Sequence, residues 1–360
     1  MNTLNKINLD CGKLSKFFNG SNNLVFTLGK EDSKILNIGN NEYKHLFNHN
    51  FNENIVYFVD IEISNDNKYL ALNYNEGISS INIRNLHNNK ELEFDGSKFI
   101  EPEDSFYTIE YQFTKDSNQL LMGSGNYLKL LNLNDSKCEK TLSIMDDEAQ
   151  CTMAVKLNKE NNKVLVYCAV ESTVQLIIFD FPSLKIIDKL VLDGFDYTGD
   201  IWHSEPFLNA DFNLFNDNEI LFATPFSNSI QIYNYSNQKL SNTNFSIPNE
   251  VDNYIRKYIE NFYISSDFSK LFLLYVDKMA IFDFKSQKLL YNEKRLRLGL
   301  GSGNFLSTNM ESTKLITSSY HWSEEIRNFG LEVFDISTFK YDKLYSIIND
   351  NMLFLNEKYQ

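Results

Sequence analysis

Ile281-Phe282-Asp283-Phe284-Lys285-Ser286-Gln287-Lys288 is one copy of a pattern that recurs along the chain. In this pattern a short apolar run ends in Asp or Asn, and a Lys follows five positions later. The copies are Asn85/Lys90, Asn132/Lys137, Asp180/Lys185, Asn234/Lys239, Asp283/Lys288 and Asp335/Lys340, and Asn37 holds the first position without the Lys. Successive copies lie roughly 50 residues apart, a period typical of β-propeller blades.

Each repeat contains four apolar runs separated by turn residues. In the second repeat these runs cover residues 56–64, 69–74, 78–86 and 90–94. The turn between the first and second runs carries an acidic residue in most repeats, namely Asp66, Asp116, Glu160, Asp217, Asp267 and Glu311. Asp suits such turns because its side chain accepts hydrogen bonds from nearby backbone N–H groups. We therefore expect four antiparallel strands in each repeat.

Some of the predicted strands are apolar on both faces, as in Val174-Gln175-Leu176-Ile177-Ile178-Phe179. An antiparallel sheet with one face in water would alternate apolar and polar residues. Blades stacked around an axis are covered on both faces by their neighbours, which removes that requirement. The sequence therefore predicts an all-β, seven-bladed β-propeller of four-stranded antiparallel blades.

The repeats predict one propeller domain over residues 1–360. The seven repeats cover about 13–50, 56–97, 106–146, 151–195, 206–247, 260–297 and 303–347. Two further strand-like segments, 3–9 and 351–356, lie outside the repeats. We expect one of them to close the ring by pairing across the seam, because an open end exposes a sheet edge. The resemblance of 3–10 to the predicted strand 187–193 favours the N-terminal segment.

One insertion departs from the all-β pattern. Apolar residues at Val251, Tyr254, Ile255, Tyr258, Ile259 and Phe262 follow the spacing of one face of a helix. We therefore expect one short helix near 250–262. Its role is either to cap one end of the propeller or to bind a partner.

The repeats resemble those of the WD40 family over nearly the whole chain. In that family the third strand ends in Trp-Asp, and Phe179-Asp180, Phe282-Asp283 and Phe334-Asp335 match this dipeptide with Phe for Trp. No Gly-His dipeptide precedes a first strand, so the family's His–Ser/Thr–Trp–Asp network cannot form. The four strands of each repeat are lettered A to D in chain order. The resemblance implies a rigid binding scaffold, usually for proteins, that docks partners through its B–C and D–A loops. Sugar lactonases and quinoprotein-like propellers are alternative relatives.

Charge and composition narrow the choice of partner. The formal net charge is -14 and the isoelectric point is near 4.9. Nucleic acids and anionic membranes attract basic surfaces, so we expect neither as a partner. A basic or positively patched protein is the compatible partner. The four cysteines lack CxxC spacing, and residues 1–10 lack the apolar segment of a signal peptide. We therefore expect a cytoplasmic protein.

The residues that could support catalysis are sparse. The chain has five His, none with HExxH spacing, and it has no GxSxG motif. Gly299, Gly301 and Gly303 are spaced like a glycine-rich loop, but no helical pattern follows to direct backbone amides at a phosphate. We therefore assign no catalytic residue, no metal ligand and no cofactor.

The candidate partner-binding residues surround the chain's two tryptophans and one group of acids. Trp202, His203 and Glu205 lie in a long predicted D–A loop, roughly 194–207, and a predicted B–C loop, roughly 320–328, holds the second Trp. The further candidates are Tyr320, His321, Trp322, Glu324, Asp146, Asp147 and Glu148. Trp and Tyr dominate interface hot spots because they bury much area at a low rotamer cost. The alternatives are that the aromatic side chains pack only against their own loops, and that the acids merely solubilise the surface.

These observations favour a non-catalytic scaffold or adaptor that binds another protein through one propeller face. An acidic inhibitor or immunity protein that neutralises a basic toxin would use the same binding physics. A channel-site enzyme such as a sugar lactonase is the alternative from a different functional class. It would require several acidic, amide or His side chains to converge on the central channel with a metal.

Overall fold

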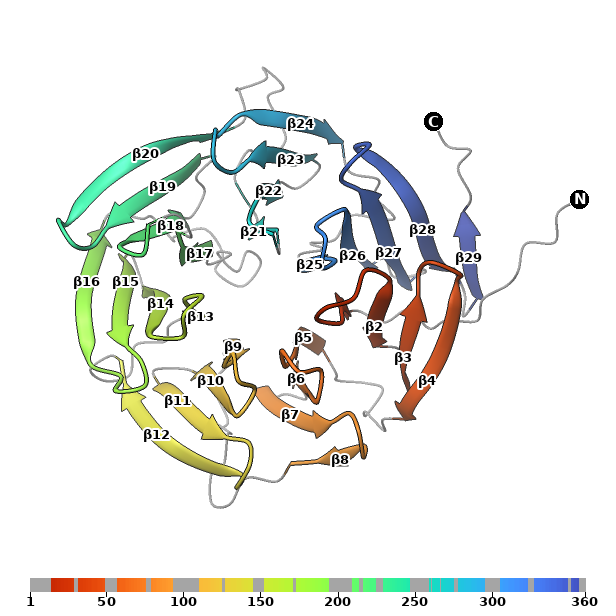
Figure 1. Ribbon diagram of the computed structural model, residues 1–360, viewed down its shortest axis with the longest axis horizontal. Helices are drawn as coiled ribbons and strands as arrows, with labels where there is room; N and C mark the ends of the chain where they lie inside the picture. Colours follow the sequence, from red (N-terminus) through yellow and green to blue (C-terminus); the bar gives the residue numbers. More distant parts are fainter. Residues whose placement is uncertain are drawn as a thin grey trace, which may run out of the picture. The chain divides into compact units, whose positions relative to one another are not determined.

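The structure of the chain is a computed structural model, shown in Figure 1. It describes residues 14–28, 32–48, 57–75, 79–92, 110–124, 127–144, 152–170, 173–193, 209–213, 216–224, 229–246, 259, 261–265, 267–274, 278–294, 305–322, 327–348 and 351–355. The described residues form strands and turns, with no helix among them. They make up seven antiparallel sheets, which are the blades of a seven-bladed β-propeller and confirm the predicted fold class.

The strands follow chain order within every blade. Blade 1 holds β1 (Leu14–Phe17), β2 (Leu24–Leu28), β3 (Asp32–Asn37) and β4 (Glu42–Asn48); blade 2 holds β5 (Tyr57–Ile63), β6 (Tyr69–Asn75), β7 (Ser79–Asn85) and β8 (Lys90–Glu91); blade 3 holds β9 (Glu110–Phe113), β10 (Gln119–Ser124), β11 (Tyr127–Asn132) and β12 (Lys137–Ser143); blade 4 holds β13 (Thr152–Leu157), β14 (Lys163–Val170), β15 (Thr173–Asp180) and β16 (Ile186–Asp193). Blade 5 holds β17 (Asn209–Phe212), β18 (Glu219–Ala223), β19 (Ser229–Asn234) and β20 (Lys239–Ser246); blade 6 holds β21 (Asn261–Ile264), β22 (Lys270–Leu274), β23 (Lys278–Asp283) and β24 (Leu289–Lys294); blade 7 holds β25 (Phe305–Thr308), β26 (Lys314–Trp322), β27 (Arg327–Asp335), β28 (Lys340–Ile348) and a fifth strand, β29 (Asn351–Leu355).

The repeated Asp or Asn ends the third strand of every blade. These residues are Asn37, Asn85, Asn132, Asp180, Asn234, Asp283 and Asp335. Each side chain accepts hydrogen bonds from the C–D turn that follows it. For example, Asp335 Oδ1 accepts from the backbone N–H groups of Ser337 and Thr338, both at 2.9 Å. The sequence repeat therefore records a local structural requirement, because an acceptor at this position closes the hairpin.

The A–B turns use two different side chains for one purpose. In blade 3, Thr114 Oγ1 donates to Asp116 Oδ1 at 2.6 Å, and the same carboxylate oxygen accepts from the Asn118 N–H at 3.1 Å. Blade 4 has Asn158 where blade 3 has Thr114. There the Asn158 Oδ1 itself accepts from the N–H groups of Asn162 and Lys163, both at 2.9 Å. An acceptor within the turn is thus retained when the residue changes.

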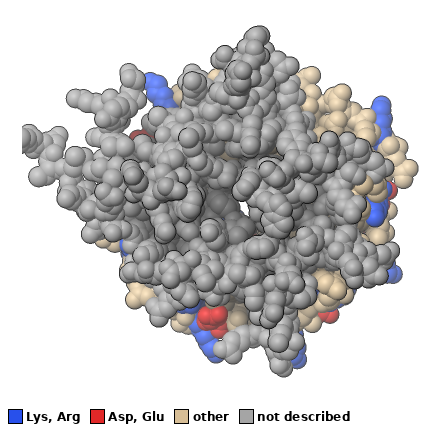
Figure 2. Space-filling view, turned by 180° about the vertical axis from the view of Figure 1, so that it is seen from behind, with Lys and Arg blue, Asp and Glu red and all other residues tan. Residues whose placement is uncertain are grey.

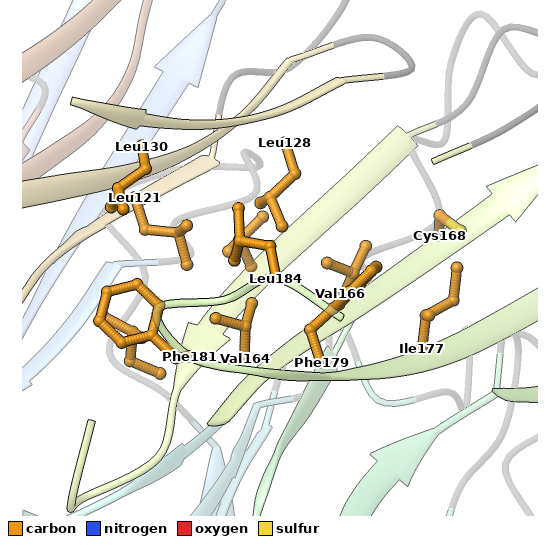
Figure 3. Packing of buried hydrophobic residues seen from close by; sticks show 12 residues of the cluster. Leu121, Leu128, Leu130, Val164, Val166, Cys168, Ile177, Phe179, Phe181 and Leu184 are labelled. Atoms are coloured by element: carbon orange, nitrogen blue, oxygen red, sulfur yellow. The ribbon is translucent and has the colours of Figure 1, made fainter. Parts of the chain in front are cut away.

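The chain divides into two compact units, Glu62–Asn261 and the combination of Met1–Ile61 with Phe262–Gln360. In the first of these units, neighbouring blades pack through apolar side chains. Figure 3 shows one such cluster, in which residues from β10 and β11 of blade 3 meet residues of blade 4. Leu121, Val164 and Phe179 are each at most 1% exposed there. Full burial of one large apolar side chain stabilises the fold by about 1.5–3 kcal/mol.

Apolar packing also covers the other face of blade 4. Leu176 and Ile178 lie in a cluster with Phe212 and Phe222 of blade 5. Tyr167, at 0% exposed, satisfies its hydroxyl by donating to the Ala223 carbonyl oxygen at 2.9 Å. Blade 4 is therefore covered on both faces by its neighbours, as its two-sided apolar sequence predicts.

In the second unit, blade 7 lies beside blade 1 although the two are far apart in sequence. The Phe17 N–H donates to Ser307 Oγ at 3.2 Å, and the Met310 N–H donates to the Ser21 carbonyl oxygen at 3.1 Å. Asn22 Oδ1 accepts from the Glu311 N–H at 3.1 Å. The contact between the first and last blades therefore includes backbone groups at the inner strand and at the A–B turns.

The C-terminal of the two candidate closing segments pairs within its own blade. We expected one of the segments 3–9 and 351–356 to pair across the seam and favoured the N-terminal one, which stays a prediction. Strand β29 instead pairs antiparallel with β28 and extends its own blade to five strands. Segment 3–9 lies outside the described residues, as does most of the predicted helix near 250–262. The helix does not reach Phe262, because that residue belongs to strand β21 and pairing within blade 6 prevails over the helical spacing.

The A–B turn of blade 3 provides a test of the hydrogen-bond pattern. The hydrogen bond from Thr114 is the largest influence on Asp116 and, with that from Asn118, lowers the pKa of the carboxyl below its ordinary 3.8, although burial opposes the shift. Asp116→Ala should lower the free energy of unfolding by about 1 kcal/mol at neutral pH, measured by urea denaturation. Because the folded-state pKa is depressed, the difference should be full above 3.8 and disappear as the pH falls through the lowered value.

Glu160→Ala is the matched control, because Glu160 occupies the equivalent position in blade 4, where Asn158 supplies the acceptor. It should change the free energy of unfolding much less than Asp116→Ala. Equal losses in the two variants, or a loss that does not depend on pH, would contradict the assignment of the Asp116 carboxylate as the structural acceptor.

Candidate binding surfaces

Most residues of the predicted binding surface lie outside the described residues. Residues 194–208 include Trp202, His203 and Glu205, residues 145–151 include Asp146, Asp147 and Glu148, and residues 323–326 include Glu324. The structure does place the backbones of Tyr320, His321 and Trp322, all within strand β26. Whether any of these residues contacts a partner stays a prediction.

The position of the second aromatic group corrects the sequence analysis. A loop over roughly 320–328 was expected, but β26 continues to Trp322 and β27 begins at Arg327, so only 323–326 separate the strands. Tyr320 pairs with Phe329, His321 with Asn328 and Trp322 with Arg327. Aromatic residues favour the pleated, half-buried surface of a strand. Both strands of this hairpin have nine residues, more than the second and third strands of any other blade.

The first strands of blades 3, 4 and 5 carry a polar residue two positions before the A–B turn. These residues are Gln112, Lys156 and Asp211, each flanked in sequence by buried apolar residues. Gln112 Oε1 accepts from the backbone N–H of Leu157 in the next blade at 2.7 Å. The position therefore links neighbouring blades, and the sequence motifs gave no sign of it because the residue type changes from blade to blade.

Asp211 stands out among these polar residues. Its side chain is only partly exposed, and burial by the surrounding protein raises the pKa of its carboxyl. The positive charge of Lys156 and a hydrogen bond from the Phe212 N–H to Asp211 Oδ1 at 2.8 Å oppose this rise without cancelling it. A carboxyl with a raised pKa is a candidate for function on physical grounds, but structural networks produce the same shift.

A second candidate surface is the fourth strand of blade 4. Among the described residues, eight large hydrophobic side chains are exposed, and three of them lie on the eight-residue strand β16. Ile186 is 61% exposed, Ile187 45% and Val191 44%. Scattered exposed apolar residues are ordinary on protein surfaces, whereas several on one strand indicate a contact surface.

A β-bulge explains why two consecutive isoleucines are both exposed. Ile178 pairs with Asp188 and Phe179 pairs with Ile186, which leaves Ile187 as the extra residue. A bulge disturbs the alternation of side chains locally. The exposed residues Ile186, Ile187, Lys189 and Val191 therefore lie on one face, and we call this set the β16 strip.

The opposite face of β16 is held in place by blade 5. Asp188 Oδ2 accepts from the Tyr233 hydroxyl at 2.5 Å, and Asp188 Oδ1 accepts from Gln238 Nε2 at 3.4 Å. Burial raises the pKa of Tyr233, and its hydrogen bond to Asp188 raises that pKa further, so the phenol remains a donor. Leu190 and Leu192 pack against the same inter-blade cluster. The β16 strip is therefore presented on a strand fixed by its neighbours.

Charged side chains do not add a further candidate surface on the face shown in Figure 2. In Figure 2 the visible Asp and Glu atoms of described residues form small separate groups near the rim and do not gather into one acidic patch. Among all the residues that the structure describes, no three His, Cys, Asp or Glu side chains come together as a metal site would require. No helix there is long and apolar enough to cross a membrane.

Comparison with known proteins identifies the fold of the chain. No protein-family model matches the chain, and no curated protein matches its sequence. Among solved structures, it is similar to a chain in "Crystal Structure of Mitotic Checkpoint Complex", with a TM-score of 0.57, 12% identity, and coverage of 87% of this chain and 86% of that chain. This likeness confirms a WD40-like propeller at the level of the fold. In all, 1065 solved chains match, and so widely shared a fold does not specify a function.

The raised pKa of Asp211 predicts a pH-dependent effect on stability. A carboxyl whose pKa is higher in the folded protein than in the unfolded chain destabilises the fold once it ionises. Asp211→Asn should therefore gain stability relative to the wild type as the pH rises from acidic to neutral, and this advantage should shrink as the pH falls. Thermal unfolding at several pH values measures the difference.

Glu62→Gln, two residues before the A–B turn of blade 2, controls for exchanging a carboxylate for an amide at this position. A difference between Asp211→Asn and the wild type that stays constant from acidic to neutral pH would contradict the inferred ionisation penalty. So would a loss of stability in Asp211→Asn at neutral pH.

Proposed function

We propose that this protein is a non-catalytic cytoplasmic scaffold that binds another protein. The observation that supports this proposal best is the WD40-like propeller fold with blades held rigid by packing and turn hydrogen bonds. One solved chain with a similar fold comes from the structure titled "Crystal Structure of Mitotic Checkpoint Complex". A rigid framework favours binding because little conformational entropy is lost when a partner docks.

The proposed contact surface combines the two tryptophans, the polar residues near them in sequence, and the acidic residues 146–148. Its members are Trp202, His203, Glu205, Tyr320, His321, Trp322, Glu324, Asp146, Asp147 and Glu148. The β26–β27 hairpin supports part of this set, because its two nine-residue strands are longer than the second and third strands of any other blade. Extending a hairpin costs conformational entropy, and contact with a partner would offset that cost.

The net charge of -14 favours a basic partner. It fits an adaptor for a basic protein and also an acidic inhibitor that neutralises a basic toxin. Both functions require the same kind of surface, and the genes beside this one would distinguish them. A toxin gene next to it would favour the inhibitor, and its absence from related gene neighbourhoods would favour the adaptor.

The first test of the proposed surface is aromatic truncation. After a partner has been identified by affinity purification and mass spectrometry, Trp202→Ala and Trp322→Ala should each weaken its binding by about 2 kcal/mol or more. Calorimetry measures the binding, and thermal unfolding measures stability in parallel. Tyr43→Ala is the matched control, because Tyr43 is an aromatic residue of β4 that is 44% exposed. If the Trp variants lose stability but keep their affinity, these side chains serve only to pack their own segments.

The second test concerns charge. Association with the partner should slow as salt is added, because exposed charges are screened beyond about 10 Å at 0.1 M ionic strength. Stopped-flow measurements at low and high salt give the association rate. Neutralising Asp146, Asp147 and Glu148 together should reduce this salt dependence. A rate that does not change with salt would exclude electrostatic steering by the acidic residues.

A further inference from the structure

Blade 7 shows how the outer edge of a blade in this protein takes an additional strand. Strand β29 pairs antiparallel with residues Leu344–Ile348 of β28. That stretch begins two residues after the bulge in β28, where Lys343 pairs with Val333 and Tyr341 pairs with Phe334. The bulge disturbs the edge near the C–D turn, and regular pairing resumes beyond it.

Blade 4 repeats this backbone geometry without an added strand. Its bulge lies at the equivalent position, since Asp188 pairs with Ile178 and Ile186 pairs with Phe179. The residues of β16 equivalent to Leu344–Ile348 are therefore 189–193. Among the described residues, β16 pairs only with β15, and its outer edge carries no further strand. An unpaired edge offers a row of backbone donors and acceptors to an extended segment.

The side chains of this stretch specify what such a segment would carry. Lys189 and Val191 are exposed on the β16 strip, and Ile186 and Ile187 extend the apolar part of the strip. Residues directly opposite one another in an antiparallel pair lie on the same face and interact. An acidic residue would therefore lie opposite Lys189, and a β-branched or other apolar residue would lie opposite Val191.

We propose that residues 189–193 of β16 bind an extended segment of a partner protein by antiparallel β-strand addition, with an acidic residue of that segment opposite Lys189 and an apolar residue opposite Val191. The inference rests on the proposed function only in requiring a protein partner. It adds a docking site on blade 4 to the surface around the two tryptophans. The hydrogen bonds of Asp188 to Tyr233 and Gln238 prearrange this edge, so that the incoming segment alone must become ordered.

The test uses the full-length protein and a fluorescently labelled peptide, Ser-Gly-Asn-Thr-Val-Thr-Glu-Gly-Ser. In antiparallel register its Glu lies opposite Lys189 and its Val opposite Val191. The same peptide with Lys in place of Glu should bind about fivefold or more weakly, as measured by fluorescence polarisation at low salt. A peptide with Pro in place of Val should not bind measurably, because Pro has no N–H for the ladder and interrupts strand pairing. Hydrogen exchange should slow within 189–193 when the Glu peptide is bound.

A charge-reversal variant distinguishes strand addition at this site from non-specific peptide binding. Lys189→Glu should reverse the preference and favour the Lys peptide. Val191→Asn should weaken binding of the Glu peptide, whereas Leu240→Asn should leave it unchanged, because Leu240 on β20 of blade 5 is 43% exposed and so matches Val191 at 44%. The inference is wrong if the wild type and Lys189→Glu share one preference, if Leu240→Asn matches Val191→Asn, or if protection falls outside 189–193.

A failure of the proposed β16 site can be distinguished experimentally from a failure of the proposed scaffold function. If the peptides fail but the natural partner still depends on Trp202 and Trp322, the scaffold stands and the site on β16 is wrong. If the peptides bind as expected and no partner depends on the two tryptophans, the edge site stands and the proposed aromatic surface is wrong.

Discussion

The structure depends on the mutual covering of blades whose sheets are apolar on both faces. Blade 4 has Phe179 in the cluster shared with blade 3 and Leu176 in the cluster shared with blade 5, each at most 1% exposed. A sheet of this kind cannot leave either face in water without losing about 1.5–3 kcal/mol for each large side chain that is uncovered. Stacking of blades is therefore required by the side chains themselves, and each blade's stability depends on its neighbours.

Hydrogen bonds at the turns decide how each blade closes, and they tolerate changes of residue. Thr114 with Asp116 and Asn158 alone are two solutions that supply acceptors to the same backbone N–H groups. Neighbouring blades are also linked by hydrogen bonds between their A–B turns. In blades 2 and 3 the Asp66 N–H donates to Ser117 Oγ, and in blades 6 and 7 the Asp267 N–H donates to Ser312 Oγ. Because the turn requires an acceptor rather than one particular residue, the repeats can differ in sequence at this position.

Once packing and turns are satisfied, the surfaces left for binding are edges, strand ends and loops. The contrast between blades 4 and 7 shows this most directly. The two blades share the position of the bulge, but the edge of β28 pairs with β29, whereas β16 presents exposed Ile, Lys and Val side chains. The propeller provides the same edge seven times, and side-chain chemistry on each outer strand determines what that edge can bind. The shared fold therefore does not by itself specify a function.

The sequence by itself determined the number of blades, the strand order within them and the position of the repeated Asp or Asn at the end of the third strand. These features follow from local periodicity and from hydrogen bonds between residues close in sequence, as at Asp335 and Ser337. The sequence wrongly predicted that Trp322 lies in a loop. Where a hairpin ends depends on pairing between its two strands, here β26 and β27, and the sequence repeat carries no information about that pairing. Only the tertiary structure decided that β29 joins its own blade, that Asp211 carries a raised pKa beside Lys156, and that one face of β16 is exposed. The physical reason is that burial, charge environment and edge pairing are set by neighbouring strands and blades, which a reading of one segment does not contain.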